Sequence, residues 1–424
     1  MALAICLDMD AIDAALRARD VHALHALAFT SGFGSKRLDC WAVLLGVDLN
    51  ALAPLDVASA ASDSVHRDKS TVDKDVARSL WRFADGRTRK RRRACLRRVL
   101  NATFDGDVCY YQGFHDVAEV VLGVCGFERP HVAVALCRAL ARTRFADATR
   151  ASFEAVALSL RLVVPLVFAG DEALGAALFA GPDESWELLR EPLWALSWVI
   201  TWFAHDVEDG GALLDLWDRL LAGSALEPCY PLYVAAALVL ERRGELLDAA
   251  AAADHAAPLH AALARLSRTP ADWRAVAGRA SALLKATPPP DAIKRVPRGE
   301  LRAALAPLEV AVRAGDDRAR FFSFRRRPAA AAAALLRTTG GRLPPPPPPH
   351  HPQHHHRRHR RRRRGGGRDV AVVARPSPRR NGARARSLAA GVLLAGAAAT
   401  ALLGDGGAES FSLWARELVL RLGS

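Results

Sequence analysis

The sequence lacks the cysteine spacings that build disulfide frameworks or structural zinc sites. Its 424 residues include seven cysteines, an odd number, and no two are spaced as C-x-x-C or paired with histidines at zinc-binding spacing. A disulfide scaffold and a zinc domain are therefore disfavoured, and a reducing, cytosolic environment is favoured. The first twenty residues carry Asp8, Asp10 and Asp13 and lack the basic start of a secretory signal.

Excess positive charge is absent from the first 324 residues, although the whole chain has a net charge of +14. The stretch from Arg325 to Arg386 contains 18 Arg and one acid, Asp369, so it accounts for the excess. A nucleic-acid-binding domain normally has a basic face of its own. We therefore expect no specific nucleic-acid partner.

Alternating apolar and polar residues bounded by hairpin turns, the pattern of β-strands, are not found either. Apolar residues instead recur at intervals of three and four, as in Val72, Val76, Leu80 and Phe83, and in Val117, Val120, Val121 and Val124. The sequence predicts an all-α domain over residues 1–298, followed by a helical extension over residues 299–323.

Residues 324–386 are rich in Arg, Pro, His and Gly and contain the polyproline run Pro344–Pro349. Such a composition buries too little apolar surface to offset the entropy of ordering, so we expect a disordered basic linker. The polyproline run could instead dock to an SH3 or WW domain, but a plain spacer is favoured.

Residues 387–404 are uncharged and would span about 27 Å as a helix. Because the arginine-rich stretch precedes them and the following residues are slightly acidic, the arrangement fits the positive-inside rule. We expect a transmembrane anchor, with residues 405–424 as a short lumenal tail. A buried helix of a soluble protein is the alternative, because the segment is short and rich in Ala and Gly.

Three short blocks in the helical domain contain candidate functional residues. The first runs from Arg37 to Trp41, and the second includes Asp75 and Arg78. A helix continuing to Phe83 would place both charged residues opposite the apolar stripe, where the i, i+3 carboxylate could orient an exposed guanidinium. Taken alone, this pattern is also that of an ordinary solvated helix face.

The third block, Tyr110-Tyr-Gln112-Gly113, lies where a loop is expected to end and a helix to begin. Gly113 permits a turn, and Asp116 favours the helix N-terminus that follows. Gln112 would then project from a rigid helix entrance. A turn glutamine that bonds the local backbone is the alternative.

Together the blocks resemble the three signature motifs of TBC-domain Rab GTPase-activating proteins, R-x-x-x-W, I-x-x-D-x-x-R and Y-x-Q-G, in the same order. The blocks Leu196–His205 and Leu216–Asp218 are also similar to helices of that family. The residues in these blocks are most similar to those of the membrane-anchored, endoplasmic-reticulum branch of the family. Val72 replaces the usual Ile, and Phe114-His115 stand where many members have Met-Asn; we expect neither departure to touch the chemistry.

The resemblance implies an arginine finger at Arg78 and a glutamine finger at Gln112, supplied to a GTP-bound Rab GTPase. It assigns supporting roles to Asp75, Tyr110, Gly113, Arg37 and Trp41, of which Arg37 and Trp41 are expected to be mainly structural. The chain would be an activator of an enzyme, with no metal site or cofactor of its own, because Mg²⁺ would come with the partner's nucleotide.

The resemblance also implies that the chain regulates traffic from the endoplasmic reticulum to the Golgi. The positive-inside arrangement would leave the catalytic domain facing the cytosol. The first alternative is a catalytically silent TBC scaffold that binds Rab or membrane partners. The second is a tail that binds RNA or anionic lipid, with the helical domain as a carrier.

A cluster of basic residues, Arg87, Arg89–Arg93, Arg97 and Arg98, separates the second block from the third. It could be a nuclear-localisation signal or meet an acidic Rab or membrane surface. A solvated helix start is favoured, and no aromatic platform accompanies the cluster to stack nucleic-acid bases.

Overall fold

The computed structural model describes residues 2–314, apart from residues 53–54, 64–65, 81–82, 105–107 and 182–183. Within those residues every regular element is a helix, so the prediction of an all-α fold is confirmed. The first eight α-helices are α1 (Ala2–Ala18), α2 (Val21–Thr30), α3 (Arg37–Leu45), α4 (Val57–Asp63), α5 (Lys69–Ala77), α6 (Gly86–Thr103), α7 (Phe114–Cys125) and α8 (Pro130–Thr143).

The remaining helices follow in close succession along the chain. They are α9 (Glu154–Leu160), α10 (Val163–Gly170), α11 (Glu172–Phe179), α12 (Glu187–Arg190), α13 (Leu196–Ile200), α14 (Gly210–Leu226), α15 (Tyr230–Glu241), α16 (Arg243–Ala251), α17 (Ala256–Arg265), α18 (Trp273–Ala286), α19 (Pro289–Arg295), α20 (Glu300–Ala304) and α21 (Ala306–Ala314). Short 3₁₀ turns are η1 (Gly34–Lys36), η2 (Leu49–Ala51), η3 (Glu184–Trp186), η4 (Leu193–Ala195) and η5 (Leu266–Arg268).

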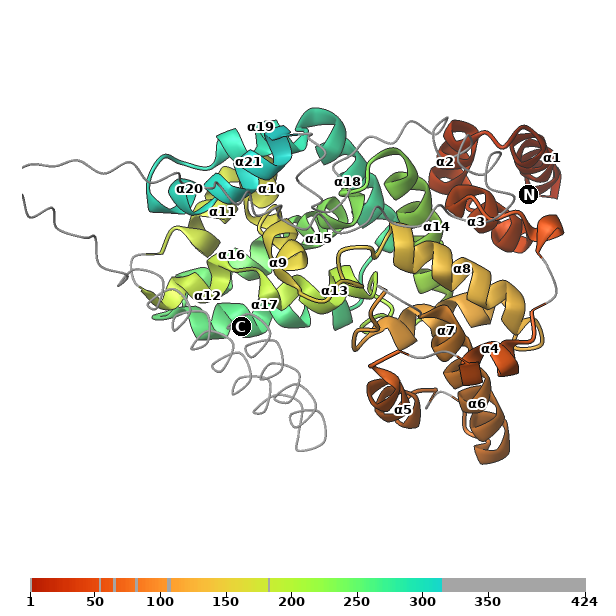
Figure 1. Cartoon of the computed structure of the whole chain (residues 1–424). Coiled ribbons are helices and arrows are strands. Elements are labelled where there is room, and N and C mark those ends of the chain that lie inside the picture. Colours follow the sequence, from red (N-terminus) through yellow and green to blue (C-terminus); the bar gives the residue numbers. More distant parts are fainter. Residues whose placement is uncertain are drawn as a thin grey trace, which may run out of the picture.

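The helices form an elongated assembly with α1–α8 at one end (Figure 1). Helices α13, α14, α15 and α18 occupy the middle, and α10–α12, α16, α17 and α19–α21 lie at the other end. The central helix is α15, whose residues Tyr230–Leu240 are all buried and which packs on α10, α14 and α18. A helix that is apolar on every side is stable only when neighbours surround it.

Aspartate side chains begin six of the described helices. Asp20, Asp56, Asp85, Asp171, Asp209 and Asp272 accept hydrogen bonds from backbone N–H groups in the first turns of α2, α4, α6, α11, α14 and α18. Each cap satisfies donors that have no partner within the helix and contributes about 1 kcal/mol. The same residue type therefore sets the starting points of helices at both ends of the molecule.

The helix predicted to continue to Phe83 is wrong, because α5 ends at Ala77 and Arg78 is its C-cap. Leu80 adopts a left-handed conformation with φ of 58°. Its N–H donates to a carboxylate oxygen of Glu119 in α7, over 3.1 Å. A tertiary hydrogen bond thus replaces the intrahelical one.

The side-chain burial predicted for the apolar stripe nevertheless holds for Val72, Val76 and Leu80, which are all buried. Although α5 ends at Ala77, the side chain of Leu80 still packs in the core. The Arg93 guanidinium of α6 fixes this exit, because its Nε and Nη2 donate to the Ser79 carbonyl over 2.9 and 2.7 Å.

Helices α20 and α21 cover residues 300–314, inside the stretch expected to form a helical extension. The expected linker, anchor and lumenal tail, residues 324–424, lie outside the described residues. In the part of the chain that the structure describes, no helix combines the length and the apolar character needed to cross a bilayer.

Candidate functional site

Arg78 stands at the C-terminal end of α5, where its side chain remains 39% exposed. Its Nη2 pairs with Oδ1 of Asp75, one helical turn earlier. The ion pair expected from the i, i+3 spacing is therefore present. Asp75 does not lie on a solvated face, however, because its side chain is only 1% exposed. A buried carboxylate holds a half-exposed guanidinium.

The second oxygen of Asp75 connects α5 to the loop before α7. Tyr110, itself buried, donates its hydroxyl to Oδ2 of Asp75 over 2.6 Å. The N–H of Tyr110 donates to Asp68, the residue before α5, over 3.1 Å. These two hydrogen bonds join the second and third sequence blocks, which are far apart along the chain.

Gln112 lies two residues beyond Tyr110, at the entrance of α7, and is half-buried. No described residue forms a hydrogen bond with its carboxamide, so within this part of the chain the side chain is not engaged in a local turn. Gly113, the N-cap of α7, has φ of 111°, a conformation that L-residues avoid. A Cβ at this glycine would also meet Thr201 Cγ2 at 3.1 Å.

His115 and Asp116, in the first turn of α7, form part of an ionic network that the sequence analysis did not predict. His115 Nδ1 lies 3.5 Å from Asp75 Oδ2, and His115 Nε2 lies 3.3 Å from Asp116 Oδ1. His205 Nδ1 lies 3.0 Å from the other oxygen of Asp116. We expected the departure from the family pattern at position 115 not to touch the chemistry; His115 contacts the carboxylate that pairs with Arg78.

Within this network, each charged group stabilises the charged form of its neighbours. Burial alone lowers the pKa of His115, but the Asp116 and Asp75 carboxylates outweigh burial and raise it to about 9. Burial opposes ionisation of Asp75 and Asp116 as well, yet the neighbouring His115 lowers the pKa of both carboxyls. His205 has a raised pKa because it hydrogen-bonds to Asp116.

The turn after α13 contacts the loop that carries Gln112. Trp202 and Phe203 are buried and adopt left-handed conformations, with φ of 49° and 64°. Such conformations cost of order 1–3 kcal/mol each and persist only where packing enforces them. The Tyr111 hydroxyl donates to the Ile200 carbonyl over 2.6 Å, which fixes this turn against the loop that carries Gln112.

The signals for the missed residues were present in the sequence blocks. Asp68 lies in the block His66-Arg-Asp68, and His205 follows the apolar run Ile-Thr-Trp-Phe-Ala. A titratable residue next to an apolar run, such as His205, indicates a polar contact at the edge of the core. Sequence alone could not identify its partner, because Asp116 and His205 are 89 positions apart.

Arg37 and Trp41 contact a different carboxylate. Arg37 donates to both oxygens of Asp218 over 2.8 and 2.9 Å, and Trp41 Nε1 donates to it over 2.7 Å. The N–H of Phe33 donates to it over 3.2 Å, and Arg37 also reaches Asp215 over 3.1 Å. Asp218 is fully buried, so these contacts fix α3 onto α14. The structure therefore joins Arg78, Asp75 and Tyr110 through direct contacts, with Gln112 and Gly113 on the same loop as Tyr110, and places the contacts of Arg37 and Trp41 elsewhere.

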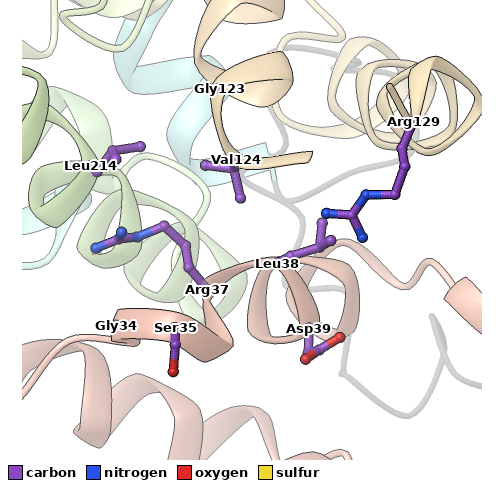
Figure 2. Close-up of a pocket in the computed structure, with 9 residues that line it drawn as sticks. All are labelled: Gly34, Ser35, Arg37, Leu38, Asp39, Gly123, Val124, Arg129 and Leu214. Carbon is purple, nitrogen blue, oxygen red and sulfur yellow. The ribbon is translucent and has the colours of Figure 1, made fainter. Parts of the chain in front are cut away.

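A pocket of about 410 Å³ lies between α3, the end of α7 and α14. Figure 2 shows the Arg37 side chain pointing toward the helix that carries Leu214 and the Asp39 side chain pointing away from the pocket. Arg37 uses Nε and Nη2 to pair with Asp218 and Asp215, so its charge is already compensated by two carboxylates. The lining residues are Gly34, Ser35, Arg37, Leu38, Asp39, Gly123, Val124, Arg129 and Leu214.

The basic cluster lies on α6, and only part of it is solvated. Arg92 stacks over Phe83 and Phe127, with its guanidinium carbon 3.8 and 4.8 Å from the ring centroids. Arg97 pairs with Asp73 of α5 over 2.6 Å. Arg92 and Arg93 hold the segment after Arg78 against α6, and Arg97 holds α5 against it. The exposed members are Arg87, Lys90, Arg91 and Arg98.

Comparison with known proteins identifies the family. The sequence model of the Rab-GTPase-TBC domain matches residues 35–247, half of the chain. GTPase-activating protein gyp10 of Schizosaccharomyces pombe is 27% identical over 217 residues, 50% of this chain and 54% of its own length. TBC1 domain family member 20 of Homo sapiens and of Bos taurus is 29% identical over 237 residues, 54% of this chain and 55% of its own length.

The chain thus spans about half the length of the curated relatives it matches. The matched region extends from η1 to α16 and contains all three sequence blocks together with the strained turn after α13. On the extent of this match, the chain belongs to the Rab-GTPase-TBC domain family.

Proposed function

We propose that the chain accelerates GTP hydrolysis by a Rab GTPase, with Arg78 as the arginine finger and Gln112 as the glutamine finger. The observation that carries the proposal is the 2.6 Å hydrogen bond between Tyr110 and Asp75. It ties the residue that pairs with Arg78 to a residue two positions before Gln112. A single buried carboxylate therefore pairs with Arg78 and holds the loop that carries Gln112.

The chemistry required of each side chain is specific. Negative charge grows on the transferred γ-phosphoryl group and its bridging oxygen as the bond breaks, and a guanidinium from another protein stabilises that charge by a factor of about 10³–10⁵ in rate. A carboxamide can orient the attacking water. Arg78 suits the first role because Asp75 fixes it while leaving it 39% exposed. Gln112 suits the second because it stands at a rigid helix entrance.

The proposal is tested with a panel of GTP-loaded Rab proteins and the full chain. At least one Rab should be stimulated, and Arg78→Ala should reduce the stimulation by about 10³-fold or more. Arg298→Ala is the matched control, because Arg298 is exposed beside α20, at the other end of the molecule from α5 (Figure 1). A scaffold without catalysis would bind a Rab in this panel and leave its hydrolysis rate unchanged.

We propose as well that residues 387–404 anchor the chain in the endoplasmic reticulum membrane, where it regulates traffic toward the Golgi. Support comes from the uncharged run of these residues and the arginine-rich stretch before it. An anchor would raise the effective concentration of the domain near membrane-bound Rab proteins.

Deleting residues 387–404 tests the anchor. The intact chain should sediment with membranes and resist extraction by alkaline carbonate, whereas the deleted chain should remain in the supernatant. A chain that lacks these residues and still resists extraction would show that another segment binds the membrane.

A further inference from the structure

We propose that His115 is a positioning residue for Arg78: it bridges Asp75 and Asp116 in a chain of alternating charges that runs from Arg78 to His205. The proposal rests on the proposed function in one respect, namely that Arg78 acts on a nucleotide held by a Rab. The geometry itself is independent of that function.

The chain of contacts is continuous from a half-exposed arginine to a half-exposed histidine. Arg78 pairs with Oδ1 of Asp75, and His115 Nδ1 faces Oδ2 of Asp75 at 3.5 Å. His115 Nε2 then faces Asp116 at 3.3 Å, and the second oxygen of Asp116 faces His205 at 3.0 Å. His115 has both ring nitrogens directed at carboxylates. A neutral imidazole has only one N–H to donate, whereas the imidazolium donates to both.

Among the described residues, the charged and titratable groups that act on His115 come from three elements. Helix α5 contributes Asp75, with Arg78 at its C-cap, and the loop and first turns of α7 contribute Tyr110, Asp116 and Glu119. The turn after α13 contributes His205. The carboxylates outnumber the cations in direct contact with His115, so the site favours the imidazolium. The rise in the pKa of His115 to about 9 agrees with this geometry.

The imidazolium has a mechanical consequence for Arg78. Asp75 is 1% exposed and shares its charge between Arg78, Tyr110 and His115. With His115 charged, Oδ2 is held by two donors and Oδ1 stays directed at Arg78. With His115 neutral, the buried carboxylates Asp75 and Asp116 lose the cation between them and repel each other. We expect Asp75 to rotate and Arg78 to lose its fixed rotamer.

The test is the pH profile of kcat for the full chain with a stimulated Rab, corrected at each pH for hydrolysis by the Rab alone. The wild-type kcat should fall as the pH rises through about 9. His115→Gln should lower kcat by about 10- to 100-fold, as expected for a misplaced catalytic group. It should also remove the alkaline fall and leave KM unchanged, because His115 is buried and offers no surface for a Rab to bind.

Asp116→Asn provides the second variant, because it keeps the size of the side chain and removes one of the two charges that favour the imidazolium. The alkaline fall should move to lower pH in this variant. A role limited to stability would lower the amount of folded protein and leave the pH of the fall unchanged. His255→Gln is the control, since His255 is exposed beside α17, remote from α7 (Figure 1). Its profile should match that of wild type.

A second measurement requires no Rab and separates this proposal from the proposed function. In the full chain, ¹⁵N signals of the Arg78 side chain, assigned by their loss in Arg78→Lys, should show restricted rotation near neutral pH. That restriction should vanish as the pH rises through about 9 and in folded His115→Gln at any pH.

Each outcome decides the matter. Stimulation of a Rab by the wild-type chain, with an unaltered kcat profile in both variants, would overturn the positioning role and leave the proposed function standing. If no Rab is stimulated, the proposed function fails, and the Arg78 signals alone decide the positioning role. Arg78 signals that are the same in wild type and His115→Gln would overturn it.

Discussion

At the scale of single residues, the site depends on buried carboxylates that use both of their oxygens. Asp75 binds Arg78 with one oxygen and Tyr110 with the other, while His115 approaches from α7. The i, i+3 spacing was enough to predict the ion pair of Asp75 and Arg78. It could not predict that Asp75 is buried, because Tyr110 and His115, which contact it, come from segments 35 or more positions away along the chain.

The histidine between the carboxylates makes stability depend on pH. The pKa of His115 is raised from an ordinary 6.5 to about 9, so its contribution is fully present below about 6.5 and is lost as the pH rises through about 9. A rise of this size corresponds to roughly 3 kcal/mol. Asp75 and Asp116 have lowered pKa values, so their contributions are present above the ordinary value of 3.8 and are lost in acid.

Urea unfolding of wild type and His115→Gln at about pH 6 and about pH 10 measures this dependence. The wild type should be more stable than the variant at the lower pH, and the difference should shrink at the higher pH as the imidazolium deprotonates. An equal difference at both pH values would show that His115 contributes through packing alone.

At the scale of elements, α3 and α14 are fixed by another buried carboxylate with four hydrogen-bond donors. Burial raises the pKa of Asp218, and the Arg37 guanidinium opposes that rise. Trp41 adds a stacking contact to Trp217 of α14, with ring centroids 5.5 Å apart. These contacts join residues 37–41 to a helix almost 180 positions further along the chain.

Replacing Arg37 by Ala should therefore be costly. The change leaves the Asp218 carboxylate buried without its cation, a loss of about 3–5 kcal/mol for a buried pair. Chemical denaturation should show a lower midpoint of this size. Lys36→Ala is the matched control, because Lys36 pairs with Asp13 at the surface and should contribute at most about 1 kcal/mol. If Arg37→Ala lowers the free energy of unfolding no more than Lys36→Ala does, Arg37 does not fix α3 onto α14.

The helical elements could be predicted from their periodicity and caps, but the breaks between them could not. The burial of Val72 and Val76 follows from spacing alone. The left-handed Leu80 and the end of α5 depend on Glu119 and Arg93, which reach the segment from other helices. Tertiary hydrogen bonds of this kind leave no periodic signal in the sequence.

At the scale of the whole molecule, the site is assembled from three segments that are distant in sequence. The end of α5 supplies Arg78, and the entrance of α7 supplies Gln112. The turn after α13 contacts the entrance of α7 through the Tyr111–Ile200 hydrogen bond and through His205, which faces Asp116. Motif resemblance predicted the first two segments and their order. The third segment was noted only as a similar block, because its function arises from the strained backbone at Trp202 and Phe203.

The central claim is that Arg78 and Gln112 act as one unit on a partner's nucleotide, and a double-mutant cycle tests it most directly. The kcat for a stimulated Rab is measured with wild type, Arg78→Ala, Gln112→Ala and the double variant. Groups that act as a unit give strongly non-additive losses, so the double variant should be scarcely slower than Arg78→Ala alone. If the double variant loses the full product of the two single effects, or if either single variant keeps the wild-type rate, the account is wrong.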